Sequence, residues 1–394
     1  MRIVQIEDFF HPDAGYQINI LSKYMSKYGH EVFIITGEIE KAPEQLASFF
    51  GKEDTIFRDN EFYNATGVKI IRLPIVRYVS GRAVFRKGIY DFIDDLKPDI
   101  LYVHGNDTLV AIQYLLRLRK LKYPLIMDSH MLEMASENRF SKVFHWGYKK
   151  FITPIIIKNK ITVIRTQDDP YVEKFLGVPL GQAPWISVGS DVLLFYANEK
   201  RKMRFREKYS IPASNKVAVY IGKLDEAKGG KILAQAFEKK ILVDNGRSVT
   251  LIVVGNTSGE YGKEVDKILS RSENQILRFP TQKYIDLAKY YQVADFAVFP
   301  RQCSLSFYDA QACRLPVIAE DNNINLDRLS HENGFCFNSE SVESLREKIF
   351  QLLGMEDVSF EVMASNSYDL VKNNYNYENI AKEYMRVIER VKKV

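Results

Sequence analysis

Short apolar runs alternate with segments of helical hydrophobic spacing along the first half of the chain. Strand-like runs occupy residues 2–6, 31–36, 68–73, 99–104 and 124–130, and helical patterns occupy residues 17–30, 82–96 and 108–121. Strands that alternate with helices form parallel sheets through right-handed crossovers. The pattern therefore predicts a doubly wound α/β domain.

The same alternation starts again in the second half. Strand-like runs lie at residues 216–222, 249–255, 275–280, 296–300 and 316–321, each followed by a helix or a loop. Gly189 and Ser190 interrupt the chain between the two series. We predict two Rossmann-like domains, residues 1–193 and 194–374. Ligands of such sheets bind beyond the carboxyl ends of the strands, so two domains that face each other would enclose a cleft.

Size and composition fit a protein of this kind. The chain has 394 residues, of which 46% are hydrophobic and 27% are charged, as in ordinary globular proteins. Its net charge of +5 is small for this length and does not suggest a nucleic-acid partner. Three cysteines form no CxxC pair, the N-terminus lacks a signal-peptide pattern, and no apolar run reaches about 18 residues. We expect a cytoplasmic protein.

One basic stretch has two interpretations. Residues 139–165 contain seven lysines and arginines, no acidic residue, and the aromatic residues Trp146, Tyr148 and Phe151. Basic and aromatic residues together suit an anionic membrane surface, which would be the inner face of the cell membrane. A solvated helix followed by a core strand explains the same residues.

The turn between the strand at 216–222 and the next helix carries candidate chemistry. Lys223 and Lys228 lie five residues apart beside Gly222, Gly229 and Gly230. First-turn amides of a helix have no intrahelical partner and attract anions, and two ammonium groups would add charge to such a site. A solvated turn with two surface lysines is the alternative. The Walker pattern GxxxxGK[ST] is absent.

A second constellation follows the strand at residues 296–300. Ser304 and Ser306 stand near the start of a helix of small residues, where free amides and hydroxyls form another candidate anion site. Asp309 lies one turn into that helix. Its carboxylate is either a surface group that suits the helix dipole or a ligand for paired hydroxyls.

Taken in order, these segments resemble the family 4 retaining glycosyltransferases of the GT-B fold. In the second half the likeness rests on "GKLDEAKGG", "VTLIVVG", "YYQVADFAVFP" and "DAQACRLPVIAED". In the first half it rests on "FHPDAGYQINILSKYMSKYGHEVFIIT", "KPDILYVHGND", "PLIMDSH" and "ISVGSDVLLF". The resemblance covers nearly the whole chain. It implies two facing Rossmann-like domains, with a last helix at about 375–394 that returns to the first.

The resemblance also implies an activity and a donor site. The activity is transfer of a hexose, with retention, from a nucleotide diphosphate sugar to a glycan, a polysaccharide precursor or a lipid-linked saccharide. Gly222, Lys223, Lys228 and Gly229 would hold the pyrophosphate, and the two lysines would stabilise the leaving group. Asp309 would accept hydrogen bonds from the ribose hydroxyls.

Two positions depart from the family pattern. Arg301 replaces the first acid of the paired acidic motif, and Arg314 replaces a glycine. A cation cannot do a carboxylate's work, so Ser304, Leu305 and Ser306 would supply backbone and hydroxyl donors in its place. Loss of the donor contact is the alternative.

The first domain would bind the acceptor. By resemblance, His130 lies near the reacting sugar, where its imidazole would bond a donor hydroxyl or ease charge build-up; a purely structural histidine is the alternative. His104 and Asn106 are acceptor-site candidates, or a satisfied loop pair. The loop with Gly15 and Tyr16, where the family has two glycines, is a further acceptor candidate, and Glu7 and Asp8 follow the first strand.

We expect no metal and no cofactor other than the donor itself. No Asp-x-Asp pair occurs in the sequence, and metal-bound pyrophosphates need such carboxylates. Two other functions fit the same pattern: a nucleotide-sugar epimerase of GT-B architecture, and an inactive nucleotide-sugar-binding scaffold of a glycosylation complex. The sequence does not identify the sugar, the base or the acceptor.

Overall fold

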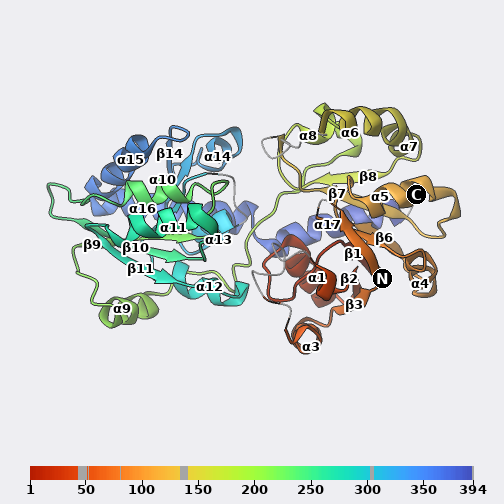
Figure 1. Cartoon of the computed structure of the whole chain (residues 1–394), viewed down its shortest axis with the longest axis horizontal. Helices are drawn as coiled ribbons and strands as arrows, with labels where there is room; N and C mark the ends of the chain where they lie inside the picture. Colours follow the sequence, from red (N-terminus) through yellow and green to blue (C-terminus); the bar gives the residue numbers. More distant parts are fainter. Residues whose placement is uncertain (43–50, 52, 80, 134–140, 302–305, 393–394) are drawn as a thin grey trace. The chain divides into compact units, whose positions relative to one another are not determined.

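The computed structural model describes residues 1–42, 51, 53–79, 81–133, 141–301 and 306–392. The chain divides into two compact units. Unit 1 contains residues 1–188 and 378–394, and unit 2 contains residues 189–377. Figure 1 shows a sheet with flanking helices in each.

Unit 1 is built on six parallel strands in the order β3-β2-β1-β6-β7-β8. The strands are β1 (Arg2–Glu7), β2 (Glu31–Gly37), β3 (Lys69–Leu73), β6 (Ile100–Val103), β7 (Leu125–Ser129) and β8 (Thr162–Arg165). The helices are α1 (Gln17–Lys27), α3 (Thr55–Thr66), α4 (Ile89–Asp95), α5 (Leu109–Leu116), α6 (Ser141–Gly147), α7 (Thr153–Lys158) and α8 (Tyr171–Lys174). A π-helical turn, η4 (Tyr148–Ile152), joins α6 to α7.

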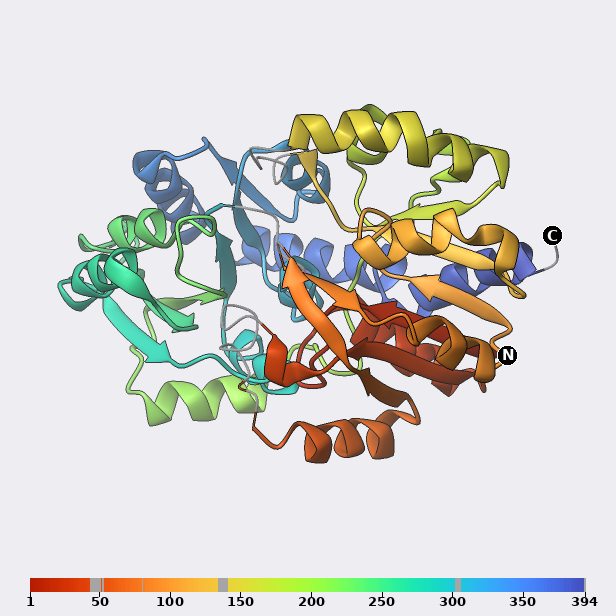
Figure 2. The same ribbon diagram turned by 45° about the vertical axis from the view of Figure 1, so that its right-hand side comes forward.

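Unit 2 repeats this topology with the order β11-β10-β9-β12-β13-β14, again all parallel. Its strands are β9 (Asn215–Ile221), β10 (Ser248–Val254), β11 (Gln275–Phe279), β12 (Phe296–Phe299), β13 (Val317–Glu320) and β14 (Gly334–Phe337). Its helices are α9 (Glu199–Lys208), α10 (Gly230–Ala236), α11 (Gly259–Ser270), α12 (Tyr284–Tyr291), α13 (Ser306–Ala312), α14 (Asn323–Arg328), α15 (Val342–Gly354) and α16 (Asp357–Asn374). Helices cover the sheet in the turned view as well (Figure 2).

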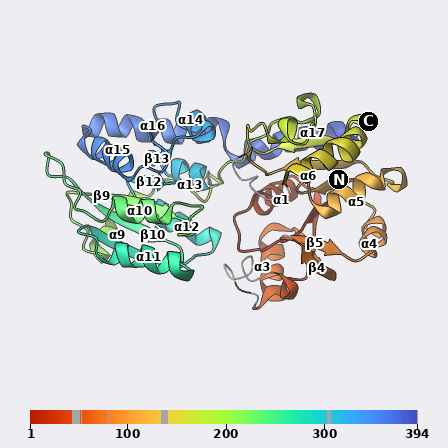
Figure 3. The ribbon, with the colours of Figure 1, turned by 45° about the horizontal axis from the view of Figure 1, so that its top comes forward.

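The last helix, α17 (Tyr377–Lys392), packs into unit 1 although it follows unit 2 in the chain. Its apolar stripe is buried, with Ile380, Tyr384 and Ile388 at most 2% exposed. Gln17 of α1 donates a hydrogen bond to the Tyr384 hydroxyl. Figure 3 shows α17 in blue beside the helices of this unit.

One predicted helix is partly wrong. Residues 82–96 do not form a single helix, because Arg82–Phe85 is strand β5, antiparallel to β4 (Ile75–Val79). Gly81 adopts a φ of 77° in the connection, and Ala83 and Phe85 are buried in the core of unit 1. The helical part is α4 alone. No helix among the described residues is long and apolar enough to cross a bilayer.

Each sheet has one point where the strand order changes direction. In unit 1 this point lies between β1 and β6, and in unit 2 it lies between β9 and β12. The crossovers leave in opposite directions there, which opens a crevice at the carboxyl ends of the two strands. The predicted site residues lie beside these two points.

Candidate functional site

In unit 2, the two predicted lysines flank the turn that leaves β9. The Lys228 amide donates to Oδ1 of Asp225 (3.0 Å), and the Gly230 amide donates to the Asp225 carbonyl (3.0 Å). Asp225 therefore closes the turn into α10. Lys223 is exposed, and Lys228 is half-buried. Both lie at the edge of the sheet where β9 ends.

Gly229 brings this turn against the end of β12. Its φ of 71° is in the left-handed region, and a Cβ there would lie 3.1 Å from Cβ of Arg301 and 3.2 Å from the Pro300 carbonyl carbon. Arg301 donates to the Glu226 carbonyl (3.3 Å) and forms a 2.6 Å ion pair with Glu340. The structure thus brings Arg301 to the lysine turn. Sequence reasoning missed Glu340, which reaches this place from the loop after β14.

Asp309 lies in α13 and is buried, with 3% of its surface exposed. Its Oδ1 accepts hydrogen bonds from the Ser190 hydroxyl (2.7 Å) and the Tyr284 hydroxyl (3.3 Å). Burial raises its pKa to about 8, and the carboxylate of Asp191 adds to the rise. The surface alternative for Asp309 is therefore wrong, and its contact with a ribose stays a prediction.

The remaining predictions in this loop have mixed outcomes. Ser304 and Leu305 lie outside the described residues, and Ser306 is the half-buried first residue of α13. Arg314 adopts a φ of 62°. It thus takes a left-handed conformation that a glycine would adopt easily. Its guanidinium donates to the Glu361 carboxylate (3.2 Å) and to the Ser365 hydroxyl (2.9 Å).

A groove that sequence reasoning missed lies beside α11 and β11 and reaches the loop after β10. It has a volume of about 630 Å³. Its lining includes Gly255, Asn256, Thr257, Arg278, Phe279 and Pro280. Because β10 pairs with β9, the part of the groove at Gly255, Asn256 and Thr257 lies at the same strand edge as Lys223. The strand ends themselves were the available signal.

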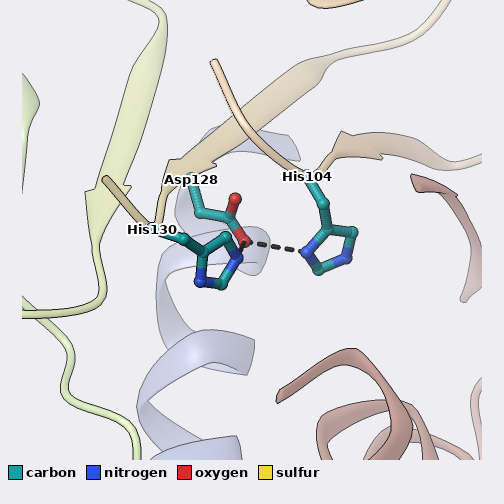
Figure 4. A group of neighbouring side chains, drawn as sticks. All are labelled: His104, Asp128 and His130. Atoms are coloured by element: carbon teal, nitrogen blue, oxygen red, sulfur yellow. Dashed lines mark ion pairs between the residues drawn. The ribbon is translucent and has the colours of Figure 1, made fainter. Parts of the chain in front are cut away.

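In unit 1, His104, Asp128 and His130 meet at the ends of β6 and β7 (Figure 4). Oδ2 of Asp128 lies 2.8 Å from Nδ1 of His104 and 3.2 Å from Nε2 of His130. Tyr102 donates its hydroxyl to the same oxygen (2.6 Å), and the Gly105 amide donates to Oδ1 (2.8 Å). Asp128 is the residue that sequence reasoning missed here, although it stands two positions before His130.

The charges of this cluster stabilise one another. Burial opposes ionisation of Asp128, but the imidazoles of His130 and His104 outweigh it and hold the pKa of this carboxyl well below its usual range. Burial likewise opposes protonation of His130, yet the Asp128 carboxylate raises the net pKa of its imidazole. The His130 side chain is 40% exposed, whereas those of Asp128 and His104 are buried.

The predicted acceptor residues of this unit are largely enclosed. His104 is buried, and its Nε2 lies 2.8 Å from Oε1 of Gln5. Asn106 is fully buried and exchanges hydrogen bonds of 3.1 Å with the Tyr148 hydroxyl. Tyr16 precedes α1 and is 42% exposed, directly after Gly15. Direct contact of these residues with an acceptor stays a prediction.

Two adjacent carboxyl groups follow β1 at the same edge. Asp8 is buried, and its backbone carbonyl accepts a hydrogen bond from the Tyr78 hydroxyl (3.1 Å). Burial raises its pKa to about 7, helped by Glu7 and opposed by Arg82, which lies 3.9 Å away. Burial also raises the pKa of Glu7. This edge therefore offers polar groups of both charges to a ligand.

Comparisons with known proteins agree with this architecture. Residues 215–355 match the family model "Glycosyl transferases group 1". A probable sucrose-phosphate synthase of Thermosipho melanesiensis is 23% identical, with 96% of this chain and 92% of that protein covered. A D-inositol 3-phosphate glycosyltransferase of Segniliparus rotundus is 30% identical over 33% of this chain and 30% of that protein.

Solved structures match over the whole length. A glycosyltransferase of Rickettsia africae superposes with a TM-score of 0.73 at 15% identity, with 99% and 98% of the two chains covered. HepE of Anabaena, solved in complex with UDP and glucose, gives a TM-score of 0.74 at 16% identity, with 99% and 100% covered. Residues 215–355 are thus similar to the glycosyl transferases group 1 family model, and the whole chain has the GT-B fold.

Proposed function

We propose that this chain is a retaining family 4 glycosyltransferase. It moves a hexose from a nucleotide diphosphate sugar to a glycan, a polysaccharide precursor or a lipid-linked saccharide. The observation that carries the proposal is that the turn with Lys223 and Lys228 lies against Arg301 at the strand edge between β9 and β12, inside the matched residues. Three cations at the end of such a sheet suit a diphosphate.

The two lysines, the groove and His130 have different parts in this proposal. Lys223 and Lys228 bind the pyrophosphate, and their charge stabilises the leaving diphosphate as its bond to the sugar breaks. The groove beside α11 and β11 takes the nucleotide base, because one end of it lies at the same strand edge. His130 donates a hydrogen bond to an oxygen of the reacting sugar. The cations of this site replace a metal ion, so turnover needs none.

Donor binding and turnover test the proposal directly. Uridine, guanosine and adenosine diphosphate sugars are screened by thermal shift, with the uridine series first because a similarly folded protein was solved with UDP-glucose. Lys228→Ala removes a charge-assisted contact with the donor, so the affinity for the nucleotide diphosphate sugar falls about tenfold to a hundredfold. Lys263→Ala, which removes a lysine 75% exposed on α11, leaves it unchanged.

The outcomes separate the possible functions. Transfer that continues in excess EDTA supports catalysis without a metal, and transfer that requires added Mg²⁺ or Mn²⁺ contradicts it. Binding of a donor without transfer or hydrolysis identifies the inactive scaffold, which the ion pair of Arg301 with Glu340 favours. Interconversion of the donor sugar without an acceptor identifies an epimerase.

We further propose that unit 1 binds an anionic membrane surface. Trp146 on α6 and Phe151 on η4 are 60% and 58% exposed. Lys150 lies over both rings, at 4.8 Å and 5.4 Å from their centroids. Aromatic side chains beside lysines insert at the level of lipid headgroups while the ammonium groups bind phosphate. A lipid-linked acceptor would be reached from this surface.

A further inference from the structure

We propose that Asp128 is a positioning residue that holds the imidazole of His130 in its protonated form, with Nδ1–H available to an oxygen of the sugar substrate. The inference rests on the role assigned to His130 above. It adds a residue that neither the sequence motifs nor the comparisons single out.

Both carboxylate oxygens of Asp128 already have partners within the protein. Tyr102, His104 and His130 all converge on one oxygen, Oδ2 of Asp128, and the Gly105 amide uses the other. The side chain is fully buried. Asp128 therefore cannot bind a substrate itself, and any effect on the reaction must pass through the rings that it holds.

The neighbours of His130 determine which of its ring nitrogens carry a hydrogen. Its Nδ1 lies 3.4 Å from Oγ1 of Thr166, and the Thr166 hydroxyl donates its own hydrogen to the Ser129 carbonyl (3.0 Å). Oγ1 is therefore left to accept, and Nδ1 carries a hydrogen. Nε2 faces the carboxylate of Asp128, which also requires a hydrogen. The imidazole carries both protons, and the long bond to Thr166 is the one that a substrate oxygen can replace.

Buried contacts hold the side chains of His104 and Asp128 in place. Nε2 of His104 faces Oε1 of Gln5, whose amide nitrogen donates to the Ser22 hydroxyl (2.7 Å). The His104 ring stacks on Tyr102, with centroids 4.1 Å apart, and lies at 19° to the plane of His130. Asp128 and His104 are thus held by buried neighbours, and His130 alone of the three reaches solvent. Figure 4 shows the two imidazole rings on either side of the Asp128 carboxylate.

A metal ion is the competing interpretation of this cluster. One ligand atom from each of the three side chains lies within 4.8 Å of the others. The nitrogen–oxygen separations of 2.8 Å and 3.2 Å are those of direct pairs, and Tyr102 occupies the same oxygen. We therefore interpret the cluster as a network of ion pairs.

Among the described residues, the charged groups that face His130 lie on four elements. They are Asp128 on β7, Glu7 at the end of β1, Arg82 on β5 and His104 after β6. Asp128 and Glu7 favour the protonated ring, and Arg82 opposes it. Asp128 makes the direct contact, so its replacement has the largest effect on the titration of His130.

The test is an NMR titration of the imidazole Cε1–H signals in the full chain. The chain has six histidines, and His130→Gln identifies the signal of His130. Asp128→Asn moves the titration midpoint of His130 to lower pH and leaves that of His331, in unit 2, in place. Tyr102→Phe keeps the carboxylate but removes one donor from it, so the midpoint moves to higher pH. This second variant keeps the test decisive if Asp128→Asn does not fold.

Activity provides the second readout. His130→Gln and Asp128→Asn lower kcat by on the order of a hundredfold, and Asp128→Asn shifts the basic limb of the pH profile to lower pH. A purely structural Asp128 would lower the yield of folded protein without moving this limb.

Three results would overturn the inference: a midpoint of His130 that neither variant changes, full activity of His130→Gln, or stoichiometric Zn²⁺ binding that abolishes the titration. The titration needs no enzymatic activity. A chain that transfers no sugar but titrates as expected therefore refutes the proposed function and leaves the role of Asp128 intact.

Discussion

Asp309 shows how far a single residue can depart from the role that its type suggests. The resemblance to family 4 glycosyltransferases predicts a carboxylate at this position that accepts hydrogen bonds from a ribose. In this chain the shorter side chain lies among Ser190, Tyr284 and Asp191, where burial raises its pKa to about 8. A group of this kind is largely neutral at pH 7. It then offers one O–H donor as well as acceptor oxygens to its surroundings.

This assignment predicts a pH-dependent stability. The folded carboxyl keeps its proton up to a pH of about 8, whereas the unfolded one loses it near 3.8. The folded state therefore binds more protons between these values, and the free energy of unfolding falls as the pH rises through that window. Asp309→Asn cannot titrate, so its unfolding free energy loses less between pH 5 and pH 8.5 in urea denaturation.

Asp286→Asn is the matched control for this measurement. Asp286 is 45% exposed and pairs with Lys289, so its replacement preserves the pH dependence of the unchanged chain. A slope in Asp309→Asn as steep as that in the unchanged chain would show that Asp309 is not the group responsible.

At the scale of elements, the turn between β9 and α10 determines where the lysines stand. Asp225 closes the turn through its side chain and its carbonyl. Gly229, directly before α10, adopts the left-handed conformation. Pro300 and Arg301 at the end of β12 lie so near Gly229 that a Cβ there would be crowded. The conformation of this turn therefore couples the two halves of the proposed diphosphate site.

A methyl group at Gly229 tests this coupling. Gly229→Ala places a Cβ in a left-handed residue and against Arg301, which costs about 1–2 kcal/mol of stability and weakens nucleotide binding. Gly147→Ala is the control, because Gly147 has helical angles of −61° and −42° and open space around it. It stabilises by about 0.4–1 kcal/mol. Equal effects of the two changes in urea unfolding would contradict the assignment.

At the scale of the whole molecule, the surface of unit 1 differs from that of unit 2 in one respect that bears on function. Trp146 and Phe151 are exposed beside lysines within a stretch that has no acidic residue. Exposed apolar residues of unit 2, such as Val358 and Ile285, are 76% and 68% exposed but lie on α16 and α12, each next to an aspartate in sequence. Charge therefore distinguishes the two surfaces.

Vesicle flotation tests this difference. The chain floats with vesicles that contain phosphatidylglycerol, and less with phosphatidylcholine alone, because each lysine near an anionic surface adds about 1 kcal/mol. The double change Trp146→Ser and Phe151→Ser reduces flotation by on the order of tenfold, and the double change Val358→Ser and Ile285→Ser does not. Flotation that is independent of lipid charge, or equal loss in both variants, refutes the membrane proposal.

Much of the fold was predictable because strand and helix periodicities are local. The short apolar centre of β1 and the apolar run of β10 are recognisable in the sequence without their pairing partners. The β4–β5 hairpin was not predictable in this way. Arg82–Phe85 runs directly into a helical pattern, and the sequence does not show that this segment pairs with Ile75–Val79. Lys223, Lys228 and the glycines beside them were identifiable because turn, charge and strand end are adjacent in sequence.

The amino-acid sequence alone determined two α/β units and the positions of the cationic turn and of His130, because each depends on residues close together in the chain. Tertiary structure decided what those groups face. Asp128 gains its role from Tyr102 and His104, which approach it from β6, and Asp309 becomes a buried acid through Ser190, which is 119 positions away. Protonation and orientation depend on neighbours in space, and sequence spacing does not specify these.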